Sequence, residues 1–212
     1  MLILNIMELK QYRKSLFRKI YHFFIILIML IGLVQLLDKK YYLAVVWIFV
    51  TPILLLVPRN IYKIKSIKNK YNAKVLFLME AFSLIFLIDG ASGTLYLYPL
   101  GIDYDSFVHF INFLLITILV ALFYTFFNNK NNLSNKEVSR FAFLSTFVVG
   151  VLFWEPFQKL NDILFGTQLF HDFVQDTKLD TLLDLGFGAI GVLFGAFLVY
   201  KYWNSWLKKW KK

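Results

Sequence analysis

Long apolar runs with little or no charge recur along this chain, and they limit its possible folds more than any other feature. Six runs stand out by length and composition: residues 20–37, 41–57, 75–88, 106–127, 140–157 and 181–200. About 20 apolar residues cross the hydrocarbon core of a bilayer as a helix, which satisfies its own backbone hydrogen bonds. The sequence therefore predicts an all-α, polytopic transmembrane bundle of about six spans.

The composition agrees with this class of protein. Hydrophobic residues make up 59% of the 212 residues and aromatic residues 19%, which is too apolar for an ordinary soluble domain. We expect one integral membrane domain over residues 1–212, with basic tails at 1–19 and 201–212. The chain has no cysteine, so disulfides, thiolate metal sites and cysteine nucleophiles are excluded.

The basic residues predict the orientation of the spans. The N-terminal tail, residues 58–74, residues 128–140 and residues 201–212 hold five, six, three and five Lys or Arg, which is 19 of the 23. By the positive-inside rule, both termini lie in the cytoplasm of a multi-pass cell-membrane protein. The net charge of +10 is then a topology signal, with anionic lipid headgroups as the expected partner of the basic segments and no nucleic acid expected.

Carboxylates lead directly into the last apolar run. On a helix, one arc of about 120° carries three acids and then three glycines: Asp176, Asp180, Asp184, Gly188, Gly191 and Gly195. The small-x3-small pattern of Gly191 and Gly195 lets a neighbouring helix approach closely, so this face should turn into the bundle. Helix capping by Thr177-x-x-Asp180 is the alternative, but it does not account for Asp184, which lies further along the span.

Two other spans carry ionisable groups at their ends. Asp105, His109 and Asn112 share one face of the fourth run, which suits a metal-ligand pair or a carboxylate-oriented proton carrier, or an ordinary hydrogen bond to a neighbouring helix. Glu155 precedes Pro156, which leaves the carbonyl near Leu152 without its usual donor.

These groups share one depth in the predicted bundle. At 1.5 Å per residue, Asp89, Glu155, Asp184 and His109 lie about 22, 22, 25 and 28 Å from the cytoplasmic ends of their helices. Nine of the 13 acidic residues belong to this outer half. So many carboxylates need a cation, protons or water to neutralise them.

The remaining segments are expected to be connections. Residues 58–74, lysine-rich with interleaved apolar residues, should lie on the lipid headgroups. Residues 91–101 should be an irregular outer segment, and residues 161–176 an outer connection, with or without a short helix. Glu80 should pair locally with Lys74 or reach to the membrane surface.

Several motifs together resemble the YjdF-like family of bacterial and archaeal multipass membrane proteins. They are Gly93-Thr-Leu-Tyr-Leu-Tyr-Pro-Leu-Gly101, Tyr104-Asp105-x3-His109-Phe110, Glu155, Gly166-Thr167-Gln168 and Asp176-Thr177-x2-Asp180. The resemblance covers residues 89–196, and Asp-x3-His-Phe with the late acidic helix is also similar to VanZ-like membrane proteins. Where the family usually has Gln-Gly-Asp, this chain reads Gln168-Leu169-Phe170, which removes the match at Asp172. Neither resemblance supplies a reaction.

Three functions remain open. In the first, a membrane enzyme binds a divalent cation such as Mg, Mn or Zn and acts on a lipid-linked or envelope substrate. Its candidate catalytic residues are Asp105, His109, Glu155 and Asp180, and its candidate metal ligands are these four with Asp176 and Asp184. The second is a cation- or proton-coupled transporter, against which stand the absence of a sequence repeat and the scarcity of charge in the cytoplasmic halves of the spans. The third is a non-catalytic membrane component.

The predicted orientation is testable with single cysteines, because the chain has none of its own. We expect Ser92→Cys and Thr167→Cys to react with a membrane-impermeant thiol reagent on intact cells. Ser66→Cys and Asn132→Cys should react only after lysis. The reverse pattern would overturn the topology.

Overall fold

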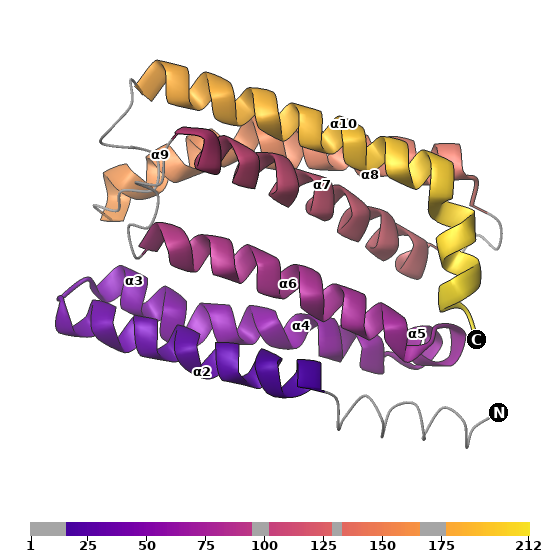
Figure 1. The fold of residues 1–212 in the computed structure, drawn as a ribbon, viewed down its shortest axis with the longest axis horizontal. Coiled ribbons are helices and arrows are strands. Elements are labelled where there is room, and N and C mark those ends of the chain that lie inside the picture. The colour runs from indigo at the N-terminus through magenta and orange to yellow at the C-terminus, as the bar shows by residue number, and fades with distance from the viewer. Residues whose placement is uncertain (1–15, 95–101, 129–132, 166–176) are drawn as a thin grey trace. The chain divides into compact units, whose positions relative to one another are not determined.

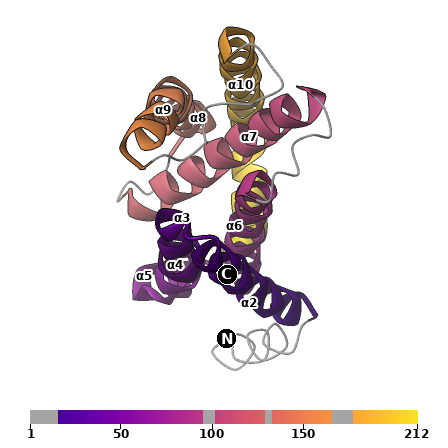
Figure 2. The same ribbon diagram turned by 90° about the vertical axis from the view of Figure 1, so that its left-hand side faces the viewer.

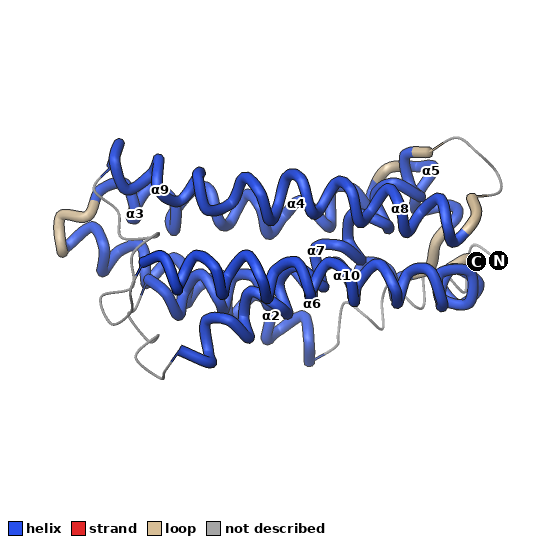
Figure 3. The backbone as a smooth tube through the Cα atoms, turned by 90° about the horizontal axis from the view of Figure 1, so that it is seen from above, coloured by secondary structure: helices blue, strands red, loops and turns tan. Residues whose placement is uncertain are grey.

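The fold is helical throughout the part of the chain that the structure describes (Figure 1). This structure is a computed structural model, and it describes residues 16–94, 102–128, 133–165 and 177–212. Over these residues helices alternate with short turns and no strand is present, as Figure 3 shows. The predicted all-α class is confirmed.

The chain divides into two compact units, residues 1–91 with 207–212 and residues 92–206. The elements of the first unit are α2 (Leu16–Leu37), α3 (Tyr41–Val45), the π-helical segment Val46–Val50, α4 (Thr51–Lys63), α5 (Lys65–Lys70) and most of α6 (Ala73–Thr94). Those of the second are α7 (Ile102–Phe127), α8 (Asn135–Ser145), the π-helical segment Thr146–Leu152, α9 (Phe153–Phe165) and α10 (Thr177–Trp210), whose last turn belongs to the first unit.

Five helical stretches among the described residues are long and apolar enough to cross a membrane. They are Lys19–Leu37, Tyr41–Lys63, Ser106–Phe127, Asn135–Phe165 and Thr181–Trp210. These correspond to five of the six predicted spans. The remaining prediction, residues 75–88, falls within the 22-residue helix α6, so the helix is confirmed while its passage across the membrane stays a prediction.

Two helices continue through prolines at which the sequence analysis ended the spans. α4 runs past Pro58 to Lys63, and α9 contains Pro156 and runs to Phe165. A π-helical segment precedes each of these helices, and Figure 2 shows α8 and α9 as parts of one rod. Each π-helical segment lies just before a proline, Pro52 or Pro156, at the turn whose carbonyl the proline ring would otherwise meet, so the wider turn makes room for the ring.

Other helix ends also differ from the sequence-based boundaries. α6 extends through residues 91–94, which were expected to be irregular, and α10 continues to Trp210, well into the predicted basic tail. The tail stays helical because its apolar positions recur at helical spacing and pack: Trp203 and Leu207 are buried. α8 begins after Ser134, whose hydroxyl accepts a hydrogen bond from the Glu137 backbone amide at 3.1 Å, and the Ser-x-x-Glu pattern at this place is typical of such a cap.

The apolar side chains of residues 58–74 pack inside the first unit, whereas Lys63, Lys65 and Lys68 are exposed, so the expected contact of this segment with lipid headgroups stays a prediction. Ile67 and Tyr71 are each 1% exposed, and the Tyr62 hydroxyl donates to the Tyr71 carbonyl at 3.2 Å. The last turn of α10 closes this corner, because the Asn72 backbone amide donates to the Trp210 carbonyl at 2.7 Å. Burial raises the pKa of Tyr71 to about 12, so its phenol stays neutral over the working range of the protein.

Each unit has its own apolar core. In the first unit, Tyr21, Ile28 and Ile31 of α2 pack with Trp47, Leu55 and Leu84. In the second, Phe113, Val151 and Val192 form the centre of a smaller cluster. Within each unit, buried residues therefore come from three successive rods of helix.

The glycines of α10 lie directly on the backbone of α7, as the small-x3-small pattern predicted. A methyl group added at Gly191 would overlap the Phe110 carbonyl oxygen, and one added at Gly195 would lie 2.8 Å from the Leu114 carbonyl oxygen. Backbone atoms have no rotamer by which to move aside. The two helices can approach this closely only because these positions carry no side chain.

Gly186 of the same helix provides a matched control, since a methyl group there would meet nothing within 4 Å. We expect Gly191→Ala to lower the free energy of unfolding in detergent by about 1–3 kcal/mol through overpacking. Gly186→Ala should leave it unchanged or slightly raise it. Equal effects of the two substitutions would show that α10 does not pack on α7 through its glycines.

Candidate functional site

The structure brings together one pair of the predicted site residues, His109 of α7 and Asp184 of α10. The His109 Nε2 and Asp184 Oδ2 atoms are 3.6 Å apart, and their side chains are 12% and 9% exposed. This separation is longer than a good hydrogen bond but within the range of an ion pair. The pair joins residues that are 75 positions apart in the sequence.

The glycine contact accounts for this pairing. His109 precedes Phe110 in α7, and the Phe110 carbonyl is the backbone atom that Gly191 faces. Asp184 lies about two turns before Gly191 on the same arc of α10, so the close approach of the backbones also brings the carboxylate towards α7. The expected inward orientation of this face is confirmed for Asp184.

Among the described residues, an apolar cluster lies beside the pair. The ring of Phe113 lies next to the His109 ring, with centroids 6.0 Å apart, and Phe113 itself packs against Val151 and Val192. Asn112 also interacts within the described structure. A carboxylate as buried as that of Asp184 needs compensation, which a proton, protonated His109, a polar neighbour or a cation can supply.

The other predicted site residues are placed only in part. The backbones of Asp105 and Asp180 lie one turn before His109 in α7 and one turn before Asp184 in α10, and Glu155 lies in α9. The side chains of these three residues, and the whole of Asp176, lie outside the described part of the chain. Among the described residues, no group of three His, Asp or Glu is arranged to hold a metal ion.

Asp89 is placed only by its backbone, because its side chain lies outside the described part of the chain. It lies in α6, and the division of the chain assigns it to the first unit, whereas His109 and Asp184 belong to the second. The predicted common depth of Asp89 with the other acids therefore stays a prediction.

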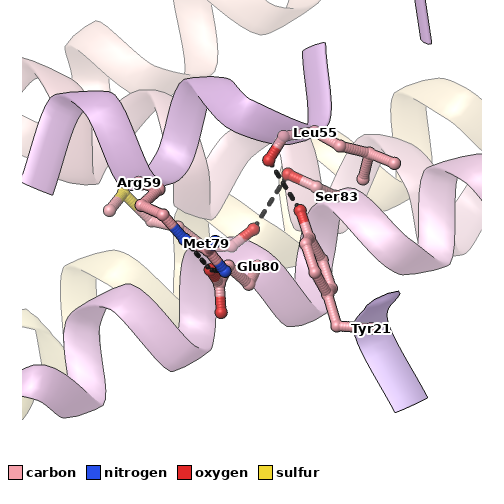
Figure 4. Close-up of polar contacts among 6 residues, drawn as sticks. All are labelled: Tyr21, Leu55, Arg59, Met79, Glu80 and Ser83. Carbon is pink, nitrogen blue, oxygen red and sulfur yellow. Dashed lines mark hydrogen bonds and ion pairs between the residues drawn. The ribbon is translucent and has the colours of Figure 1, made fainter. Parts of the chain in front are cut away.

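A second buried ionic group lies in the first unit, where none was predicted. Arg59 of α4 donates from Nη2 to the Glu80 Oε1 at 2.9 Å and from Nε to the same oxygen at 3.3 Å (Figure 4). The Glu80 side chain is fully buried and that of Arg59 is 25% exposed. The local pairing expected between Glu80 and Lys74 was wrong, because the partner comes from another helix.

Tyr21 completes this group from α2. Its hydroxyl donates to the Leu55 carbonyl at 2.7 Å, three residues before Pro58 (Figure 4). A proline disturbs the hydrogen bonds of the turn before it, and a neighbouring side chain that bonds a carbonyl there offsets this loss. Arg59, directly after Pro58, is thus held on a stretch of helix that α2 and α6 both support.

Arg59 was not expected inside the bundle, because the second span was predicted to end at residue 57. One signal was available in the sequence. Glu80 lies inside an apolar run, where a carboxylate needs a cation beside it, and Arg59 lies just beyond the predicted end of the preceding span. A span that continued through Pro58 would have brought Arg59 into the bundle.

Comparison with known proteins gives one match. The family model described as "Predicted membrane protein (DUF2238)" matches residues 20–205. No curated protein and no solved structure matches the chain. The match covers three of the five apolar stretches in full, all but the first residue of Lys19–Leu37 and all but the last five of Thr181–Trp210, and it includes both ionic groups.

The Arg59–Glu80 pair should be an essential contact of the first unit. Arg59→Met leaves a buried carboxylate without its cation and should lower the free energy of unfolding by about 3–5 kcal/mol. Arg59→Met combined with Glu80→Leu should recover most of that loss. Lys63→Met replaces an exposed cation one turn away in α4 and should change the free energy of unfolding by less than about 0.5 kcal/mol. A double variant no more stable than Arg59→Met would contradict this account, as measured by reversible unfolding in mixed micelles.

Proposed function

The chain belongs to the membrane protein family described as "Predicted membrane protein (DUF2238)", and from the pairing of His109 with Asp184 we propose that it is a membrane enzyme that uses a divalent cation. The matched range contains residues 89–196, which supports the narrower YjdF-like assignment. The proposal also places the protein in the cell membrane, with six spans and both termini in the cytoplasm. The basic segments would then face anionic lipid headgroups.

The separation of His109 and Asp184 carries this proposal. A nitrogen and an oxygen ligand each bind a transition-metal cation at about 2.0–2.2 Å, so two ligands of one ion lie roughly 3–3.5 Å apart. The 3.6 Å between Nε2 and Oδ2 is close to that separation. The two side chains fit a shared cation with little movement.

The acids around the pair would complete the ligand set. Asp105 and Asp180 lie one turn from His109 and Asp184 on the same helices, and Glu155 and Asp176 are the further candidates. Carboxylate oxygens with one imidazole suit Mn or Zn, and Mg where the carboxylates dominate. Such an ion activates a water molecule or binds a phosphate oxygen. The substrate class that fits is a lipid-linked or envelope phosphate ester, with Asp105, Glu155 or Asp180 as general base.

Transport is the second candidate function, and the first unit favours it. Glu80 and Arg59 are buried ionisable groups in a region that the sequence analysis treated as nearly free of charge. Both units also share one order of elements: a helix, then a rod with a π-helical segment and a proline, then a third helix. Such structural repeats recur in secondary transporters. Under this reading, the same His109–Asp184 pair would carry a proton or a cation.

Thermal melting with and without metal tests the enzyme proposal. The parent should melt higher with added Mn or Zn than with EDTA, by an amount that corresponds to about 2.7 kcal/mol at a hundredfold excess over the dissociation constant. His109→Gln and Asp184→Asn should lose most of this difference, because each removes a ligand. His22→Gln, an exposed histidine of α2, should keep it.

The remaining outcomes separate the alternatives. A parent that is indifferent to metal and chelator excludes the cation site. If both variants are then also as stable as the parent, the pair contributes neither a cation site nor net stability. If instead uptake into vesicles follows pH and fails in both variants, the transporter reading is supported.

A further inference from the structure

A groove in the second unit lies apart from the His109–Asp184 pair. It has a volume of about 470 Å³ and runs between Tyr124 of α7 and one face of α8. Its lining along α8 includes Lys136, Glu137, Arg140 and Leu144. Its opening onto the surface makes the groove accessible to a ligand in the membrane.

The lining changes from charged to apolar along the helix. Lys136 and Arg140 are exposed and one turn apart, and Leu144, one turn further, is 52% exposed. The track continues to exposed Val148. From Lys136 to Leu144 is about 12 Å along the axis, the scale on which a lipid changes from headgroup to acyl chain.

One wall of the groove is rigid and aromatic. The rings of Tyr124 and Phe141 stack with centroids 4.1 Å apart and planes at 18°. The Tyr124 hydroxyl donates to the Glu137 Oε1 at 3.1 Å. This hydrogen bond holds the carboxylate against α7, while the two cations of α8 remain at the charged end of the groove.

The charged side chains that line the groove favour a ligand with one negative charge. Lys136 and Arg140 contribute two positive charges and Glu137 one negative charge, so the lining of the groove carries a net charge of +1. Arg binds phosphate oxygens through its planar fork of donors, and Lys binds them as a point charge. A free phosphate would leave the apolar half of the groove unused, and a zwitterionic headgroup would bring its own cation against Lys136 and Arg140.

We propose that this groove binds one anionic glycerophospholipid. Its phosphodiester lies between Lys136 and Arg140, and one acyl chain follows Leu144 and Val148. This lipid site rests on the contact between basic segments and anionic lipid given under the proposed function, and assigns that contact to one groove. It does not depend on a cation bound by His109 and Asp184.

Photocrosslinking tests the groove with a site-resolved readout. The full chain in nanodiscs receives a trace of phosphatidylglycerol with a diazirine on its acyl chain, and mass spectrometry maps the adducts. Adducts of the parent should concentrate at residues 141–149 and fall about tenfold or more in Lys136→Gln/Arg140→Gln. The control variant Lys201→Gln/Lys208→Gln removes two exposed cations from α10 and should give as many adducts as the parent.

Two variants change the groove without removing its cations. Glu137→Gln should increase the adducts severalfold, because it removes the opposing charge, and a misfolded protein would not give this result. Tyr124→Phe should decrease them, because the released carboxylate then competes with the phosphodiester.

Three results would overturn the proposal. In the first, adducts are spread evenly over the lipid-facing side chains, or the matching phosphatidylcholine probe gives the same map. In the second, the two double variants lose adducts equally, which leaves only general attraction of basic segments to anionic lipid. In the third, inorganic phosphate displaces the probe, which makes the groove a site for free phosphate.

Discussion

The close contact of α10 with α7 is the constraint on which the second unit depends. At Gly191 and Gly195, the backbone of α10 meets carbonyl groups of α7 with no side chain between them. In a bilayer, water does not drive helices together, so close packing of small residues supplies much of the attraction. This contact also explains why an imidazole and a carboxylate so far apart in sequence come within 3.6 Å.

Both units resolve the same difficulty, which is how to keep ionisable groups inside an apolar chain. In the first unit, Arg59 neutralises Glu80 by two hydrogen bonds to one oxygen, and the pair needs nothing further. In the second, His109 is a weaker partner for Asp184, because imidazole carries charge only when it is protonated. A pair that stays charged is suited to holding helices together, whereas a pair whose charge depends on the protonation of an imidazole is suited to exchanging a proton or binding a cation. The difference favours the second unit as the functional one.

Much of the fold could be predicted from the sequence, because hydropathy, capping and small-residue patterns are local. The apolar stretches, the Ser134 cap and the glycine face of α10 all follow from such patterns. The helix ends near Pro58 and Pro156 could not, since a proline ends a helix only when nothing nearby compensates for it. Whether π turns and neighbouring side chains compensate is decided by the tertiary structure.

The candidate site was predictable to a similar extent. His109 and Asp184 stood out as polar residues in apolar helices, and the glycine arc indicated which way Asp184 faces. Arg59 was missed because its role depends on a partner in another helix, and sequence spacing within one helix does not indicate such a partner. For Asp105, Glu155, Asp176 and Asp180, convergence on one point rests on their positions along the helices.

The central claim is that His109 and Asp184 hold one cation between α7 and α10. The most direct test is pulsed electron paramagnetic resonance of the purified protein loaded with Mn²⁺, because the ion reports any nitrogen nucleus bound to it. The account predicts one bound Mn²⁺ with the modulation of a single imidazole nitrogen, absent in His109→Gln and retained in His22→Gln. A bound ion without nitrogen modulation, or modulation that persists in His109→Gln, would contradict it.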